Sequence, residues 1–144
     1  HANARRWDDF GSLFTENVVY EVPQTRERVR GLANYVEFNR TWPGAWRAEV
    51  LRIVGDGDHG ASWIDFRVDG QVMPGLSFFD LRGGRIAQIT DWWPERYEPM
   101  EPGARLNIEP CDPGPPRKLW RFIKLAYPRP LLTPVTSTIS RALN

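Results

Sequence analysis

The sequence is poor in the residues that build disulfide frameworks and most metal sites. It holds one cysteine and two histidines in 144 residues. A single cysteine excludes an intramolecular disulfide and a cysteine-ligated zinc site. The two histidines, His1 and His59, are far apart in the chain, so a histidine metal site is not expected either.

Long apolar runs and a strong net charge are also missing. No apolar run approaches about 18 residues, so no membrane-spanning helix is expected. No basic and apolar leader is present, which predicts a cytoplasmic protein, and the chain begins at His1 without a methionine, which leaves open a missing N-terminal segment. The net charge of +1 argues against nucleic acid as the main partner.

Charge and proline are distributed unevenly along the chain. Residues 1–103 carry 12 arginines and 16 acidic residues, whereas residues 104–144 carry seven basic and two acidic residues. Seven of the 13 prolines lie in the second stretch. This shift predicts a folded domain over residues 1–103 followed by a proline-rich, basic extension over residues 104–144.

The hydrophobic pattern of the first stretch changes from helical to alternating spacing. Helices grouped first and strands grouped after them predict an α+β fold. Residues 24–30 are polar, which favours a loop. The expected elements are a helix ending near Phe14, a strand over 17–22, a helix over 31–42, and strands over 46–54, 61–68, 75–81 and 86–93.

A two-residue turn at Gly83-Gly84 sets the expected register of the last hairpin. Side chains alternate along a strand, so this register places one carboxylate on an apolar face. Such a carboxylate is expected to line a cavity or to be paired. The register pairs Leu81 with Ile86, Phe78 with Ile89 and Leu76 with Asp91, and the shared face also holds Trp93.

The preceding strand leaves two alternatives open. Its polar face carries Trp63, Asp65 and Arg67, and its other face is apolar. If the polar face lies inside, Asp65 joins Asp91 in a pocket with Arg67 near the rim. If the apolar face lies inside, Asp65 and Arg67 form a surface ion pair, which suits the usual exposure of charged residues.

Three stretches of the chain resemble a known family: Trp7 to Tyr20, the pair Arg30-Gly31, and Gly75 to Trp93, with its apolar strand, glycine turn and acid before aromatics. They are similar to the nuclear transport factor two-like superfamily, and more closely to its SnoaL-like polyketide cyclase branch. The resemblance implies a curved antiparallel sheet that forms a cone around an apolar pocket. Members include ketosteroid isomerases, epoxide hydrolases, dehydratases, polyketide cyclases and non-catalytic binding domains, so the fold does not settle the function.

The resemblance carries over to individual residues only in part. The isomerase base precedes the proline of the first strand, where this chain has Val22, so that base is missing. Two acids of the limonene-type epoxide hydrolases match Asp65 and Asp91. The arginine between those acids is replaced by Trp63, and Arg67 lies on the other side of Asp65.

Together these observations predict cofactor-independent acid–base chemistry on a small hydrophobic molecule, of the cyclase, hydrolase or dehydratase type. A non-catalytic ligand-binding or interaction module of the same fold is the alternative. Asp91 and Asp65 are the expected catalytic pair, and the expected substrate-binding residues are Tyr20, Trp63, Arg67, Phe78 and Trp93.

Two further expectations concern partners. The resemblance implies a homodimer through the outer sheet face, with Phe79, Leu81 and Ile86 on it. In the extension, residues 117–127 read as a short, basic amphipathic helix that either contacts an anionic membrane surface or packs on the body.

Overall fold

The computed structural model describes residues 1–95 and 134–143, and within them the predicted α+β class is confirmed. The residues of the expected basic helix, 117–127, lie outside the described part. The helices are α1 (Trp7–Gly11), α2 (Leu32–Arg40) and α3 (Pro134–Leu143). The strands are β1 (Phe14–Val22), β2 (Glu27–Arg30), β3 (Trp46–Asp56), β4 (His59–Val68), β5 (Gln71–Arg82) and β6 (Arg85–Trp92).

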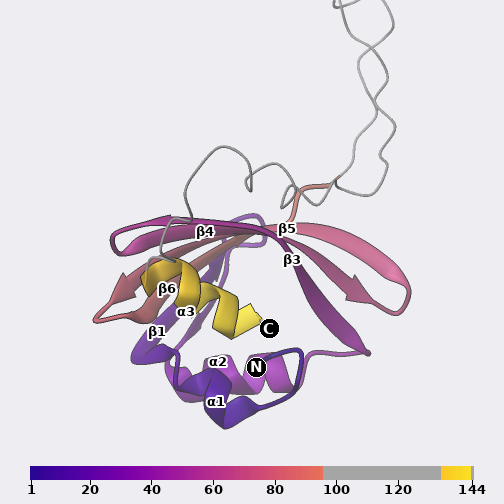
Figure 1. Cartoon of the computed structure of the whole chain (residues 1–144). Helices are drawn as coiled ribbons and strands as arrows, with labels where there is room; N and C mark the ends of the chain where they lie inside the picture. The colour runs from indigo at the N-terminus through magenta and orange to yellow at the C-terminus, as the bar shows by residue number, and fades with distance from the viewer. Residues whose placement is uncertain (96–133, 144) are drawn as a thin grey trace, which may run out of the picture.

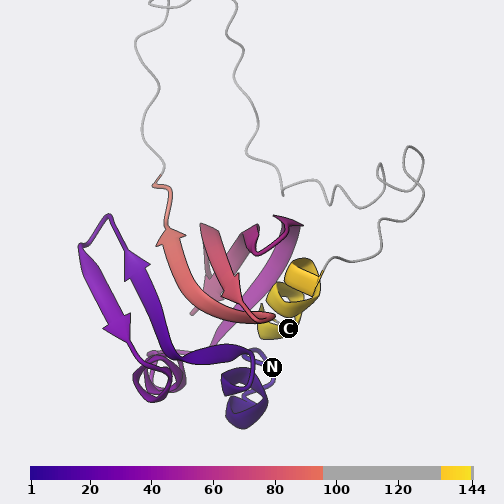
Figure 2. The same cartoon turned by 90° about the vertical axis from the view of Figure 1, so that its left-hand side faces the viewer.

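The six strands form one curled sheet in the order β2-β1-β6-β5-β4-β3. All neighbouring pairs are antiparallel except β1 with β6, which run parallel. The sheet curves over α1 and α2, and α3 lies on the same side of the sheet (Figures 1 and 2). The side chains between the sheet and the helices make up the hydrophobic core.

Strand β2 occupies part of a segment that the sequence predicts as a loop. Its four residues are mostly exposed, so they carry little of the apolar pattern that marks a strand. The strand is held by pairing with β1, where Tyr20 lies opposite Val29 and Arg28 forms an ion pair with Glu21 at 2.6 Å. This pairing is a tertiary interaction, and local propensity does not encode it.

The last hairpin has the expected turn and an unexpected bulge. Gly83 and Gly84 both have positive φ, at 56° and 74°, as a tight two-residue hairpin turn requires. Leu81 lies opposite Ile86 as predicted, but the register then shifts, because Asp80 lies opposite Gln88. Ala87 is therefore the extra residue of a β-bulge on β6.

The bulge exchanges the two faces of β5 relative to the prediction, because a slip of one residue moves every side chain to the other face. Ser77, and not Leu76, lies opposite Asp91, and Phe79, and not Phe78, lies opposite Ile89. The predicted pairs Leu76–Asp91 and Phe78–Ile89 are therefore wrong.

The residues on which the dimer argument rests are consequently in the core. Phe79, Leu81 and Ile86 are buried, so they are not available on an outer face. The outer face of β4, β5 and β6 carries a cross-strand row of half-exposed apolar side chains in their place. This row is Trp63, Leu76 and Trp92. The homodimer itself stays a prediction.

Helix α3 packs on the same body as the strands. Ile139 is fully buried, Ala142 is buried in the main core, and the Thr138 hydroxyl donates to the Gly84 carbonyl at 3.2 Å. The two ends of the chain lie side by side (Figure 1), and the Ala2 amide donates to the Ala142 carbonyl. The folded unit therefore includes part of the predicted extension. Within the described ranges, no helix has the length and apolarity to cross a membrane.

Candidate active site

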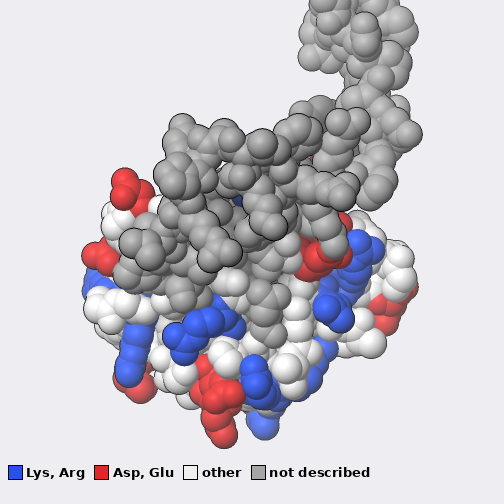
Figure 3. Space-filling model, in the orientation of Figure 1, with Lys and Arg blue, Asp and Glu red and all other residues white. Residues whose placement is uncertain are grey.

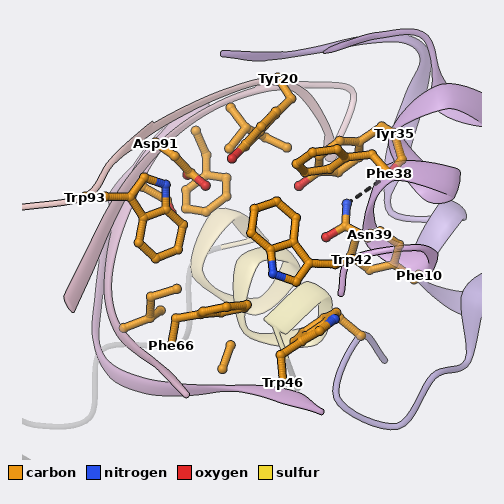
Figure 4. Close-up of a pocket in the computed structure, with 16 residues that line it drawn as sticks. Phe10, Tyr20, Tyr35, Phe38, Asn39, Trp42, Trp46, Phe66, Asp91 and Trp93 are labelled. Carbon is orange, nitrogen blue, oxygen red and sulfur yellow. Dashed lines mark hydrogen bonds between the residues drawn. The ribbon is translucent and has the colours of Figure 1, made fainter. Parts of the chain in front are cut away.

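A cavity of about 90 Å³ lies between the concave face of the sheet and α2 (Figure 4). Each water takes up about 30 Å³ in the liquid, so this space holds about three water molecules. Nine of its sixteen lining residues are aromatic, so most of its wall is apolar. The lining residues are Ala2, Phe10, Tyr20, Tyr35, Phe38, Asn39, Trp42, Trp46, Ala48, Ile64, Phe66, Ser77, Phe79, Ile89, Asp91 and Trp93.

Asp91 is the one carboxylic acid among these lining residues. It sits on β6 beyond the bulge, which turns it toward the interior. Its Oδ1 atom has no hydrogen-bond partner and no contact with solvent. Burial raises the pKa of Asp91 to about 6, and hydrogen bonding with Ser77 and Tyr20 opposes this rise. A carboxyl with such a pKa can both accept and donate a proton near neutral pH.

Two tyrosines from different elements face this carboxyl. Tyr20 comes from β1 and Tyr35 from α2, and their ring centroids are 5.3 Å apart. Burial, with the charge of Asp91 as the next cause, raises the pKa of both hydroxyls well above the usual range. Both hydroxyls therefore stay protonated and can donate hydrogen bonds. Figure 4 shows the Tyr20 hydroxyl directed toward Asp91.

Trp93 follows β6, and a side-chain clamp fixes its backbone. The Gln24 amide donates to the Trp93 carbonyl at 3.0 Å, and the Trp93 amide donates to Gln24 Oε1 at 2.6 Å. The Trp93 side chain also lowers the pKa of Tyr20, against the larger effect of burial. The loop after β1 thereby holds the end of β6 in register beside Asp91.

The structure brings together three of the seven predicted site residues. Asp91, Tyr20 and Trp93 line the cavity. The other four, Asp65, Trp63, Arg67 and Phe78, do not. Phe78 is displaced by the bulge and is 52% exposed on the outer face.

The predicted pairing of Asp65 with Asp91 is therefore not found. On β4 the apolar face, with Ile64 and Phe66, lies inside. Asp65 is on the opposite face, where Arg67 contacts it at 3.4 Å and also contacts Glu49 at 3.3 Å. The Asp65–Arg67 ion pair that the alternating pattern favours is present on the face away from the cavity, but Asp65 itself is buried and only Arg67 is half-exposed.

Several lining residues were not predicted from the sequence. Ser77 alternates with Leu76 and Phe78 along β5, so the register predicted without the bulge turns it away from Asp91. Tyr35 lies among the apolar residues at helical spacing in α2, and that spacing does not show which of them lines a cavity. Asn39 lies one turn further along α2, and its side-chain amide donates to the Tyr35 carbonyl at 2.8 Å. Its spacing of four residues from Tyr35 is the feature of the sequence that puts both residues on one face of α2.

The position of Trp93 depends on a glycine across the sheet. A Cβ on Gly75 would come within 2.9 Å of Trp93 Cζ3 and 3.0 Å of Ile64 Cγ1. We expect Gly75→Ala to displace the indole and to lower the free energy of unfolding by about 1–3 kcal/mol, as overpacking of a core does. Urea unfolding and the tryptophan emission of the folded protein measure both effects. An unchanged emission spectrum together with unchanged stability would show that the indole is not held against Gly75.

Proton transfer is the chemistry that this arrangement supports directly. One carboxyl with a raised pKa faces a mostly apolar space, and two protonated hydroxyls and one amide lie around it. Within the described ranges, no group of three or more His, Cys, Asp and Glu side chains is placed to hold a metal ion.

A curled sheet that closes over helices around a polar-tipped aromatic cavity defines the nuclear transport factor two-like class of fold. The family model of the SnoaL-like domain matches residues 1–89 of this chain. The chain belongs to the SnoaL-like family, as the resemblance in its sequence predicted. It has no match among curated proteins.

Solved structures support the same assignment. A candidate ketosteroid isomerase from Kribbella flavida is 37% identical, with a TM-score of 0.72 over 77% of this chain and 82% of that one. An epoxide hydrolase from M. tuberculosis of the LEH-like type is 18% identical, with a TM-score of 0.54 over 64% and 73% of the two chains. A candidate SnoaL-like polyketide cyclase from Jannaschia is 16% identical, with a TM-score of 0.52 over 60% and 71%. The last two likenesses concern the fold alone.

Proposed function

We propose that this chain is an enzyme that moves a proton on a small hydrophobic substrate, with Asp91 as the acid–base group. The observation that carries the proposal is the carboxyl itself. It stands in an aromatic cavity with its Oδ1 unpaired, and its pKa is raised to about 6. The similarity to a candidate ketosteroid isomerase supports it, because such enzymes use a carboxylate to move a proton next to a carbonyl.

The proposed chemistry is enolisation of a carbonyl compound. The Asp91 carboxylate takes a proton from the carbon next to the carbonyl, and the electron pair moves onto the carbonyl oxygen. Tyr35 donates a hydrogen bond to that oxygen, since its hydroxyl stays protonated and the Tyr20 hydroxyl is directed toward Asp91. Asp91 then returns the proton to carbon or oxygen, and no cofactor takes part in the step.

This role differs from the one that ketosteroid isomerases give to the residue before the first-strand proline. That residue here is Val22, which is buried and does not line the cavity. The proposed base therefore comes from β6, which pairs with β1 along the edge that faces away from β2. The family resemblance implied such a later acid through its epoxide hydrolase members.

Deuterium exchange tests the proposal even while the natural substrate is unidentified. We expect the protein to accelerate loss of the α-proton NMR signals of one or more small cyclic or aryl ketones in D₂O. Because the base must be ionised, the rate should fall as pH drops through about 6, the pKa of Asp91. A panel in which no ketone exchanges faster than in buffer would argue against the proposal, as would a rate that rises with acidity.

A non-catalytic binding function is the second candidate, and one observation favours it. The cavity contains a single carboxylic acid, because Asp65 lies on the other face of the sheet. A second carboxyl that could divide acid and base roles is thus absent from the lining residues. Saturable binding of a ketone without any isotope exchange would support this alternative.

A further inference from the structure

The cavity has one charge and no counter-charge. Asp91 is the only acidic residue that lines it, and none of the described residues around it is lysine, arginine or histidine. Its Oδ1 atom meets neither a donor nor solvent. A buried carboxylate in this state is costly, because it has lost hydration without gaining a full set of partners. A ligand that brings a positive charge beside the Asp91 carboxyl would offset this cost.

The walls of the cavity suit a cation as well. Aromatic rings attract cations over their faces, and tryptophan does so most strongly. Three tryptophans line the cavity: Trp42, Trp46 and Trp93. Trp46 already packs against a cation, since the Arg5 guanidinium carbon lies 3.9 Å from its ring centroid. Arg5 itself does not line the cavity, so it does not neutralise Asp91 there.

The other polar groups around Asp91 carry no charge that could offset the negative charge of its carboxylate. Tyr20 on β1 and Tyr35 on α2 have pKa values raised by burial, so both are neutral at physiological pH. Ser77 on β5 and Asn39 on α2 carry no charge. On the face shown in Figure 3, acidic and basic side chains are mixed, with no large region of one sign in the described part. The charge of the cavity is therefore set by Asp91.

We propose that this cavity binds small cyclic amines in their protonated form, with the ammonium group beside the Asp91 carboxyl and the ring among the aromatic side chains. The free volume of about 90 Å³ limits the ligand to a single ring with a short substituent. The same electrostatics reject carboxylates of equal size. This inference concerns binding in the cavity that the proposed function uses, and it does not require Asp91 to transfer a proton.

A series of three similar molecules with different charges tests the proposal. Benzylamine is a cation, benzyl alcohol is neutral and benzoate is an anion near neutral pH. At about pH 7.5 we expect benzylamine to bind at least about tenfold more tightly than benzyl alcohol, and benzoate to bind most weakly, in isothermal titration calorimetry. Asp91→Asn should remove the preference for the amine. Asp80→Asn, which makes the same change of charge at an exposed site, should keep it.

The wild-type protein gives a second test that does not depend on a folded variant. Benzylamine keeps its charge between about pH 8 and pH 5, whereas Asp91 becomes protonated on passing through about 6. The affinity for benzylamine should therefore fall toward that for benzyl alcohol, whose affinity should stay constant.

Equal or tighter binding of benzyl alcohol or benzoate at about pH 7.5 would overturn the proposal, as would the absence of binding by all three. Either outcome leaves the isotope-exchange result with neutral ketones untouched. Failure of the charge preference can thus be distinguished from failure of the proposed enzymatic function.

Discussion

Asp91→Asn should reduce ketone isotope exchange at least about hundredfold, which is the lower range of what a positioned general acid–base group contributes. The amide of asparagine has nearly the same shape as the carboxyl but cannot accept the proton. The rate constant measured by NMR in D₂O, at saturating ketone and about pH 7.5, gives the size of the loss. A variant that keeps more than about half of the wild-type rate would exclude Asp91 as the base.

Asp65→Asn is the matched control for this variant. It removes the same charge from the other predicted acid, which lies on the opposite face of the sheet beside Arg67. We expect its exchange rate to stay within about twofold of wild type. A large loss in Asp65→Asn would instead support the two-acid site that the sequence predicted, and it would require the faces of β4 to be exchanged.

The stability of Asp91→Asn should change in the opposite direction from its activity. The folded protein raises the pKa of Asp91, so its ionised form destabilises the fold at any pH above about 6. This cost is absent at low pH, where the carboxyl is protonated in both states. The variant should therefore be more stable than wild type by about 1–3 kcal/mol near pH 8, and the difference should shrink toward pH 4. Urea unfolding at the two pH values measures it.

Ile139→Ala should have the largest effect on stability among the predictions made for this chain. Ile139 is fully buried in the main core although it lies in a helix far from the strands in sequence. Truncation of a buried isoleucine removes apolar contacts and leaves a cavity, at a cost of about 2–5 kcal/mol. The free energy of unfolding in urea should fall by that amount.

Arg141→Ala provides the comparison within the same helix. The Arg141 side chain is exposed, so its removal should change stability by no more than about 0.5 kcal/mol. A fully stable Ile139→Ala protein would mean that α3 does not pack in the core as described. Loss of stability in both variants to the same extent would point to the helix propensity of α3, and not to burial of Ile139.

The local pattern of the sequence was sufficient to predict most elements. Alternating apolar residues and glycine turns gave the strands β3 to β6, and the helical stripe after Gly31 gave α2 within two residues at each end. These elements have strong periodicity and clear stop signals. The class of fold and the inward position of Asp91 were therefore within reach of the sequence alone.

The predictions that failed depend on non-local or single-residue features. The bulge at Ala87 leaves no mark in the composition of β6, yet it decides whether Phe78 or Phe79 faces the interior. Strand β2 exists through its pairing with β1. The side on which Asp65 lies was left open by the alternation of β4, because it depends on what covers each face of the sheet.

The bulge also bears on how this family can change over time. The inward or outward direction of everything in β6 beyond Ala87 depends on the number of residues between the turn and Asp91, and not on their identity. Replacing a residue in that stretch alters one contact. Deleting or inserting one residue would turn Asp91 and Ile89 outward together and empty the cavity of its charge. We therefore expect relatives that keep this chemistry to differ in the amino-acid residues of this segment but to keep its length.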